Sequence, residues 1–220
     1  MTAFNDLLAT AQADHQSTLA VGLAPVVARL PYEIQRYDDP FLPFGKAVID
    51  STIDLVCAYV FHLGAYLALG AAGAVALERT LAYVPTNVIR ILHGPFATAE
   101  YVQAAFEDAF DAHAVTLAAE VSPATIAAYT QQPQHGVFVR VPADFDLEAF
   151  LPIAAEHPGQ VGLYHHTKTG GVLELLADSP LEIHWHSDLI YSSQQTDFRE
   201  AIHAAASKLR QPPQKHQGLA

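Results

Sequence analysis

Short apolar runs alternate with helical stretches along most of this chain, and this alternation limits the fold more than any other feature. Strands covered on both faces read as continuous apolar runs, whereas helices that cover a sheet show apolar residues three or four positions apart. The predicted strands are residues 19–23, 55–60, 88–92, 115–118, 136–141, 161–165 and 181–186, with a further short one at 189–192. The predicted helices include residues 99–110, 147–156, 171–177 and 198–209.

This order of elements predicts an α/β fold built on a parallel sheet. Seven or eight strand–helix units favour a closed TIM-type (β/α)8 barrel over an open sheet, and the chain has neither a Gly-x-Gly-x-x-Gly nor a phosphate-loop motif. The periodicity leaves open whether the barrel is truncated or incompletely closed near its C-terminus. We expect one domain over residues 1–209, followed by a flexible polar tail over residues 210–220.

A run without Asp, Glu, Lys or Arg extends from Leu55 to Leu77 and is long enough to cross a bilayer as one helix. Its first part is rich in β-branched and aromatic residues, which favour a strand. Its second part is rich in Ala and Leu, and its helical pattern continues past Glu78 and Arg79. We therefore interpret the run as a buried strand followed by a helix.

Composition narrows the expected partners and compartment. The formal net charge of -12 repels nucleic-acid phosphates and anionic lipid headgroups, so neither nucleic acid nor a membrane is an expected partner. The one cysteine, Cys57, lies in an apolar run and has no second cysteine to pair with, which fits a reducing, cytoplasmic setting. The first residues lack the basic and apolar segments of a secretory signal.

Four segments carry a likeness to one enzyme family. They are residues 44–85 around Cys57-Ala58, the sequence Val21-Gly22-Leu23 with Pro25, residues 99–106, and Gly136-Val137-Phe138-Val139. Together they resemble the bacterial orotidine 5'-phosphate decarboxylase family. This resemblance implies a TIM-type barrel, a dimer, and decarboxylation of orotidine 5'-phosphate to UMP without a metal or organic cofactor.

The charged residues that the family uses for this reaction are missing from the matching segments. Its Asp-x-Lys-x-x-Asp motif and a further Lys supply a carboxylate that faces the substrate's carboxylate and an ammonium group that protonates the carbanion. A guanidinium, with its very high pKa, is a poor proton donor and cannot replace that lysine. On an alignment through Gly94, the degenerate catalytic positions are Ala24, Val60, Arg90, Leu92 and Pro95, and Ser187 stands where the family's phosphate-binding Arg is expected.

Histidines offer an alternative chemistry. The chain has 12 of them, and several follow predicted strand ends, where barrel active sites are built. Residues two apart in a strand share one side, so His184 and His186 could present two imidazoles to one metal. A divalent metal held by histidines is therefore the alternative to a cofactor-free site, and its candidate ligands are His62, His165, His184 and His186.

The missing charges predict a family member without decarboxylase activity, a pseudoenzyme with a binding or regulatory role. In the family, the second Asp of the motif enters the neighbouring subunit's site, and this chain offers Pro95 there. The expected assembly is a homodimer, or a heterodimer with an intact relative whose site this chain would impair. The alternative is a repurposed, metal-dependent enzyme that uses the histidines at the barrel mouth.

Overall fold

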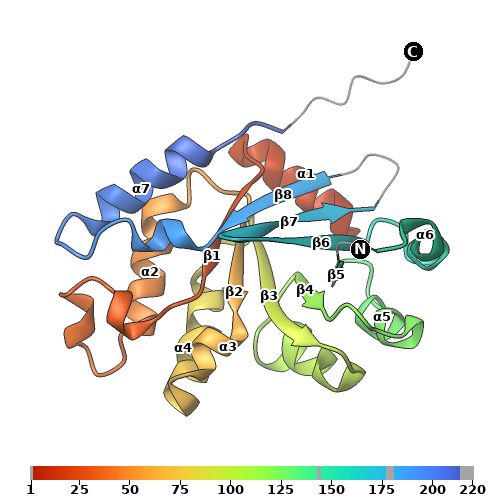
Figure 1. Cartoon of the computed structure of the whole chain (residues 1–220), viewed down its shortest axis with the longest axis horizontal. Coiled ribbons are helices and arrows are strands. Elements are labelled where there is room, and N and C mark those ends of the chain that lie inside the picture. The colour runs from red at the N-terminus through yellow and green to blue at the C-terminus, as the bar shows by residue number, and fades with distance from the viewer. Residues whose placement is uncertain (1, 143–144, 177–180, 214–220) are drawn as a thin grey trace.

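Eight strands form one closed barrel, in which neighbours in the chain are neighbours in the sheet (Figure 1). The computed structural model describes residues 2–142, 145–176 and 181–213. The strands are β1 (Leu19–Leu23), β2 (Ala58–His62), β3 (Ile89–Phe96), β4 (Ala114–Leu117), β5 (Gly136–Arg140), β6 (Val161–Thr167), β7 (Gly170–Leu175) and β8 (Leu181–His186). The α/β barrel class is confirmed, and the sheet closes through parallel pairing of β8 with β1.

The barrel departs from an all-parallel sheet at β7. This strand pairs antiparallel with both β6 and β8, whereas the other neighbouring strands pair in parallel. Only Lys168 and Thr169 separate β6 from β7, so a tight hairpin stands where a strand–helix–strand barrel has a helix.

Helices cover much of the outside of the barrel, with α2 and α7 packed side by side and α5 and α6 on another side (Figure 1). Apolar side chains of these helices and the outward side chains of β1–β6 form one continuous hydrophobic core. Ser122 and Asp146 cap the first turns of α5 and α6 by accepting hydrogen bonds from backbone N–H groups. The α-helices are α1 (Phe4–His15), α2 (Phe41–Thr52), α3 (Leu63–Leu67), α4 (Gly70–Tyr83), α5 (Pro123–Tyr129), α6 (Leu147–Ala155) and α7 (Phe198–Leu209).

A second core fills the barrel interior and is closed at the amino ends of the strands by α1. Phe4 and Leu8 of this helix are fully buried among the inward side chains. The Phe4 ring meets Phe138 edge-on at 6.0 Å between centroids. A Cβ at Gly136 would lie 2.4 Å from the Phe4 ring, so glycine at the start of β5 makes room for the helix.

Three predicted elements differ from the structure. Residues 171–177 were expected to form a helix, but β7 occupies the described part of that range, because Leu173 and Leu175 face the interior while Val172 and Glu174 face outward. The short strand expected at residues 189–192 is a 3₁₀ turn, Asp188–Tyr191. The helix expected at residues 99–110 is a 3₁₀ turn, Ala99–Tyr101, followed by a π-helix, Ala104–Asp108.

The uncharged run from Leu55 to Leu77 forms β2 followed by α3 and part of α4, as predicted. In the described part of the chain, no helix has both the length and the apolar character needed to span a bilayer. The predicted tail begins with anchored residues: Gln211 accepts a hydrogen bond from the Thr18 backbone N–H, and Arg210 donates one to the His15 carbonyl. Residues 214–220 lie outside the described residues.

Candidate binding site at the barrel mouth

The carboxyl ends of β1–β6 and β8 surround one end of the barrel, which we call the barrel mouth. The register pairs Arg140 with Tyr164, His62 with His93, and Trp185 with Gly171 across neighbouring strands, which places these residues on the inward face. A strand alternates its side chains, so one residue in two points into the mouth. The inward side chains nearest the mouth are His62, His93, Thr116, Arg140, Tyr164, His166 and Trp185.

The chain's one tryptophan, Trp185, fills the centre of the mouth. It is 3% exposed, and its ring lies 5.3 Å from His93 and 6.0 Å from Tyr164 between centroids. Two glycines make room for the indole: a Cβ would lie 2.7 Å from Trp185 Cε3 at Gly22 and 2.6 Å from Trp185 Nε1 at Gly171. The centre of the mouth is therefore occupied by an apolar aromatic group.

His93 is a neutral imidazole beside this tryptophan. Its ring lies 4.3 Å from that of His62, and its Nδ1 is 2.9 Å from Thr116 Oγ1. Burial, followed by the neighbouring His62 and Arg140, lowers the pKa of His93 to about 3. Burial, followed by His166, also lowers the pKa of His62. Near pH 7 these two rings contribute hydrogen-bonding groups rather than positive charge.

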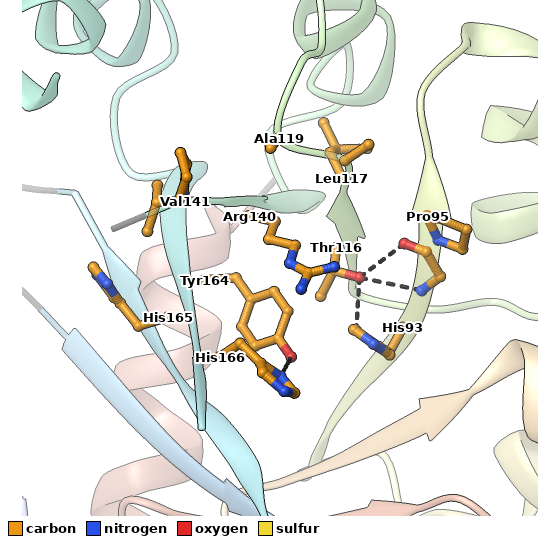
Figure 2. A pocket seen from close by; sticks show the side chains of 13 residues that line it. His93, Pro95, Thr116, Leu117, Ala119, Arg140, Val141, Tyr164, His165 and His166 are labelled. Atoms are coloured by element: carbon orange, nitrogen blue, oxygen red, sulfur yellow. Dashed lines mark hydrogen bonds between the residues drawn. The ribbon is translucent and has the colours of Figure 1, made fainter. Parts of the chain in front are cut away.

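A cavity of about 610 Å³ opens beside Trp185, between the ends of β3, β4, β5 and β6. Figure 2 shows the Arg140 guanidinium extending toward Thr116 and Tyr164 inside this space. Tyr164 Oη lies 2.9 Å from His166 Nδ1. Burial raises the pKa of Tyr164, with Arg140 opposing that shift. The cavity thus combines the charged Arg140 side chain with hydroxyl and imidazole groups.

The degenerate motif positions on β3 do not share the inward face. Leu92 belongs to the core between sheet and helices, and Arg90 points the same way, donating from Nη2 to Asp111 Oδ2 at 2.8 Å. Burial lowers the pKa of Arg90, and Asp111 opposes this. The inward residues of this strand are Ile91 and His93. On β3, the two positions aligned with the Asp-x-Lys pair therefore face the helices, and the positions that face the interior hold Ile91 and His93.

The remaining degenerate positions lie at or near the mouth. Val60 faces the barrel interior on β2, and Pro95 is exposed on the rim of β3. The Ala24 carbonyl accepts a hydrogen bond from the Tyr191 hydroxyl. Ser187 donates from Oγ to the Thr169 carbonyl at 3.0 Å. Val60, Pro95, Ala24 and Ser187 all have uncharged side chains.

The four candidate metal ligands do not converge. His62 faces the mouth, whereas His165, His184 and His186 lie on the outer face of the sheet. His184 and His186 pair in register with Leu19 and Val21, which face the helices, and His165 pairs with the outward Val172. His165 Nε2 lies 3.5 Å from Glu174 Oε2, and His184 Nε2 lies 3.2 Å from Glu182 Oε2. Across the described ranges, no group of three or more His, Cys, Asp or Glu side chains could hold a metal ion. The two-residue spacing correctly placed His184 and His186 on one side, but that side is the outside.

Sequence reasoning missed Thr116, Arg140 and Tyr164 as mouth residues. The available signal was strand alternation: Arg140 follows Phe138 by two positions, and Tyr164 follows Gly162 by two. It also took His184 and His186 as the functional pair on β8, although the large apolar Trp185 between them marks the opposite, buried face.

Comparisons with known proteins agree with this fold. No protein-family model matches the chain. An orotidine 5'-phosphate decarboxylase from Verminephrobacter eiseniae is 32% identical over 218 residues, covering 94% of this chain and 76% of the relative. Relatives of the same name from Herpetosiphon aurantiacus and Thermomicrobium roseum are 39% and 34% identical over 44% and 63% of this chain. The chain matches only 39% and 50% of the length of those two relatives.

Solved structures show the same barrel. A Streptomyces avermitilis protein proposed to be an orotidine 5'-phosphate decarboxylase superposes with a TM-score of 0.72 at 15% identity, covering 94% of this chain and 93% of that one. The Leishmania donovani OMP decarboxylase gives 0.58 at 22% identity over 74% and 69%.

These findings define a TIM-type α/β barrel with its candidate site at the carboxyl ends of the strands. The chain belongs to the orotidine 5'-phosphate decarboxylase family. The expectation that no cofactor takes part agrees with membership of this family, whose decarboxylation needs neither a metal nor an organic cofactor.

Proposed function

We propose that this chain is a non-catalytic member of the orotidine 5'-phosphate decarboxylase family that binds a small molecule at the barrel mouth. The observation that carries the proposal is the chemistry of the inward side chains. Along the eight described strands, no inward-facing residue is Lys, Asp or Glu. Decarboxylation needs a carboxylate beside the substrate's own carboxylate and an ammonium group that quenches the carbanion.

The groups present cannot easily take over these roles. His93, at the inward position nearest the family's lysine, is held neutral by burial and by Arg140. Arg140 is positively charged, but a guanidinium does not give up its proton at the pH of the reaction. Trp185 also occupies the centre of the mouth, where a substrate's reacting carbon would need access. The metal-dependent alternative gains no support, since three of its four candidate ligands lie outside the barrel.

An assay of UMP release from orotidine 5'-phosphate tests the proposal directly. We expect no release above buffer from the purified chain, with the Verminephrobacter eiseniae decarboxylase as the positive control. Turnover that survives a His93→Ala substitution unchanged would identify a contaminating host enzyme. Turnover that this substitution abolishes would overturn the proposal, because it would show catalysis at this mouth.

A regulatory role through mixed dimers is part of the same proposal. Pro95 is exposed on the rim of the mouth and offers no carboxylate to a neighbouring subunit. A heterodimer with an intact relative would therefore have one site without its borrowed acid and one without a lysine. Subunit exchange between this chain and an active relative, followed by measurement of decarboxylase turnover, tests this role. Full activity of proven mixed dimers would exclude it. If this chain forms only homodimers with itself, the relative's turnover would stay unchanged, and the regulatory role would again be excluded.

A further inference from the structure

Arg140 is a charged group in the cavity that has no counter-ion among the described residues. It is the last residue of β5, and its guanidinium points into the space between β4 and β6 (Figure 2). Its neighbours in the described structure are the Thr116 hydroxyl, the Tyr164 ring and neutral His93. The described residues that line the cavity include no Asp or Glu. Arg140 is exposed at the open wall of this cavity, and among the described lining residues no carboxylate neutralises its charge.

The groups around Arg140 complete a site for an anion. Tyr164 and His166 of β6 supply a hydroxyl and an imidazole on the cavity wall, and they contact each other at 2.9 Å. The Thr116 hydroxyl of β4 is already engaged, because it is hydrogen-bonded to Gly94 and contacts His93. A tyrosine hydroxyl and an imidazole N–H can both donate hydrogen bonds to an anion. A guanidinium forms paired hydrogen bonds with carboxylate or phosphate oxygens, which makes arginine the preferred partner for such groups.

The rest of the lining is apolar and limits the size of the ligand. Its apolar side chains are Pro95, Leu117, Ala118, Ala119, Val141 and Pro142. A volume of about 610 Å³ lies within the range of small-molecule sites. A small organic body would fit against these walls while its charged end meets Arg140, whereas a bare ion would leave most of the space empty.

We propose that this cavity binds a small organic molecule through its oxyanion, a carboxylate or a phosphate ester, with Arg140 as the charged partner and Tyr164 and His166 as hydrogen-bonding partners. The inference rests on the proposed function, since it gives the ligand class of that same mouth. The lining residues come from the ends of β3, β4, β5 and β6 and the segments that follow them, so the site lies on the β3–β6 side of the barrel.

Calorimetric titration of the full chain with sodium benzoate, phenyl phosphate and inorganic phosphate tests the inference, with sodium chloride at matched ionic strength as the salt control. We expect saturable one-to-one binding of benzoate or phenyl phosphate, weakened about tenfold or more by Arg140→Met, because hydrogen bonds to charged groups contribute that much. Arg79→Met is the matched control, since Arg79 is exposed on α4 away from the mouth.

The outcomes separate the sources of the oxyanion and the two proposals. Benzoate binding alone assigns a carboxylate ligand, and phenyl phosphate binding alone assigns a phosphate ester. Arg140→Lys, which keeps the charge but loses the paired hydrogen bonds, is expected to bind with intermediate affinity. Absence of binding by all probes, or equal binding by Arg140→Met and wild type, would overturn the inference. Decarboxylation of orotidine 5'-phosphate would instead refute the proposed function, whatever the titrations give.

Discussion

Replacing Gly22 by alanine tests whether Trp185 plugs the barrel mouth. The added Cβ would lie 2.7 Å and 2.9 Å from Trp185 Cε3 and Cζ3, closer than side-chain carbons normally approach. The third neighbour, Ser187 Cβ, is at 3.1 Å. Because Trp185 is packed against His93 and Tyr164 on its other side, the indole has little room to move away.

Two opposing effects set the change in stability. Forcing an extra methyl group into a packed core costs about 1–3 kcal/mol. Alanine also restricts the unfolded chain, which stabilises the fold by about 0.4–1 kcal/mol where the backbone conformation is ordinary, and Gly22 is not among the positive-φ glycines. The steric clash outweighs the restriction of the unfolded chain, so Gly22→Ala should lower the free energy of unfolding by about 0.5–2 kcal/mol. In a Trp185→Leu background, which lacks the two clashing atoms, the same change should be neutral or stabilising by up to about 1 kcal/mol.

Urea unfolding of four proteins tests this: the wild type, Gly22→Ala, Trp185→Leu and the double variant. Far-UV circular dichroism follows the unfolding, because tryptophan fluorescence is lost in the Trp185→Leu background. Gly64→Ala is the control, because a Cβ at Gly64 of α3 meets nothing within 4 Å. It should stabilise both backgrounds by about 0.5–1 kcal/mol. Equal destabilisation by Gly22→Ala with and without the indole would refute the plugged mouth.

Two further predictions concern buried titratable side chains. Burial lowers the pKa of His93 to about 3 and of His113 to about 4, so the unfolded chain binds more protons below pH 6.5. The free energy of unfolding should therefore fall as the pH drops from about 6.5 toward 4. The slope is up to about 1.4 kcal/mol per pH unit for each histidine that is protonated only in the unfolded chain. An NMR titration of His93 with a midpoint near 6.5 would contradict this prediction. Asp111→Asn should cost about 1 kcal/mol in urea unfolding, because it removes the charge beside buried Arg90 while Asp111 itself is 79% exposed and its attraction is screened. Asparagine tolerates the φ of 43° at this position, so an effect well above 2 kcal/mol would point to a cause other than the charge.

The strands that face both cores could be predicted, because burial on both sides leaves a continuous apolar run. β1, β2, β3, β4, β5, β6 and β8 were all located, with ends that moved by three residues or fewer at most positions. β7 could not be recognised, because Leu175 and Leu176 together give Gly171–Leu176 the spacing of a helix. What makes the segment a strand is its pairing with β6 and β8, which is a tertiary contact with no local signal.

The site was harder to predict than the fold, because it depends on which face of each strand points inward. Counting from Gly94 gave Arg90 and Leu92 as the counterparts of the family's charged pair, and both face the helices. A shift of one residue moves every side chain to the opposite face. The outward Arg90 satisfies its charge with Asp111, a residue distant in sequence, and that pairing only becomes visible in the folded chain.

The direction of β7 also bears on the proposed loss of activity. Phosphate sites in TIM barrels are frequently built from the loops after strands 7 and 8, at the carboxyl ends of parallel strands. Here Gly162, near the start of β6, pairs with Leu175, the last residue of β7, so the carboxyl end of β7 lies at the opposite end of the barrel from the mouth. At the mouth, β7 contributes instead its first residues and the two-residue turn of Lys168 and Thr169. A ligand at the mouth would therefore be bound without the carboxyl end of β7, which fits the proposed contact with Arg140 on the β3–β6 side.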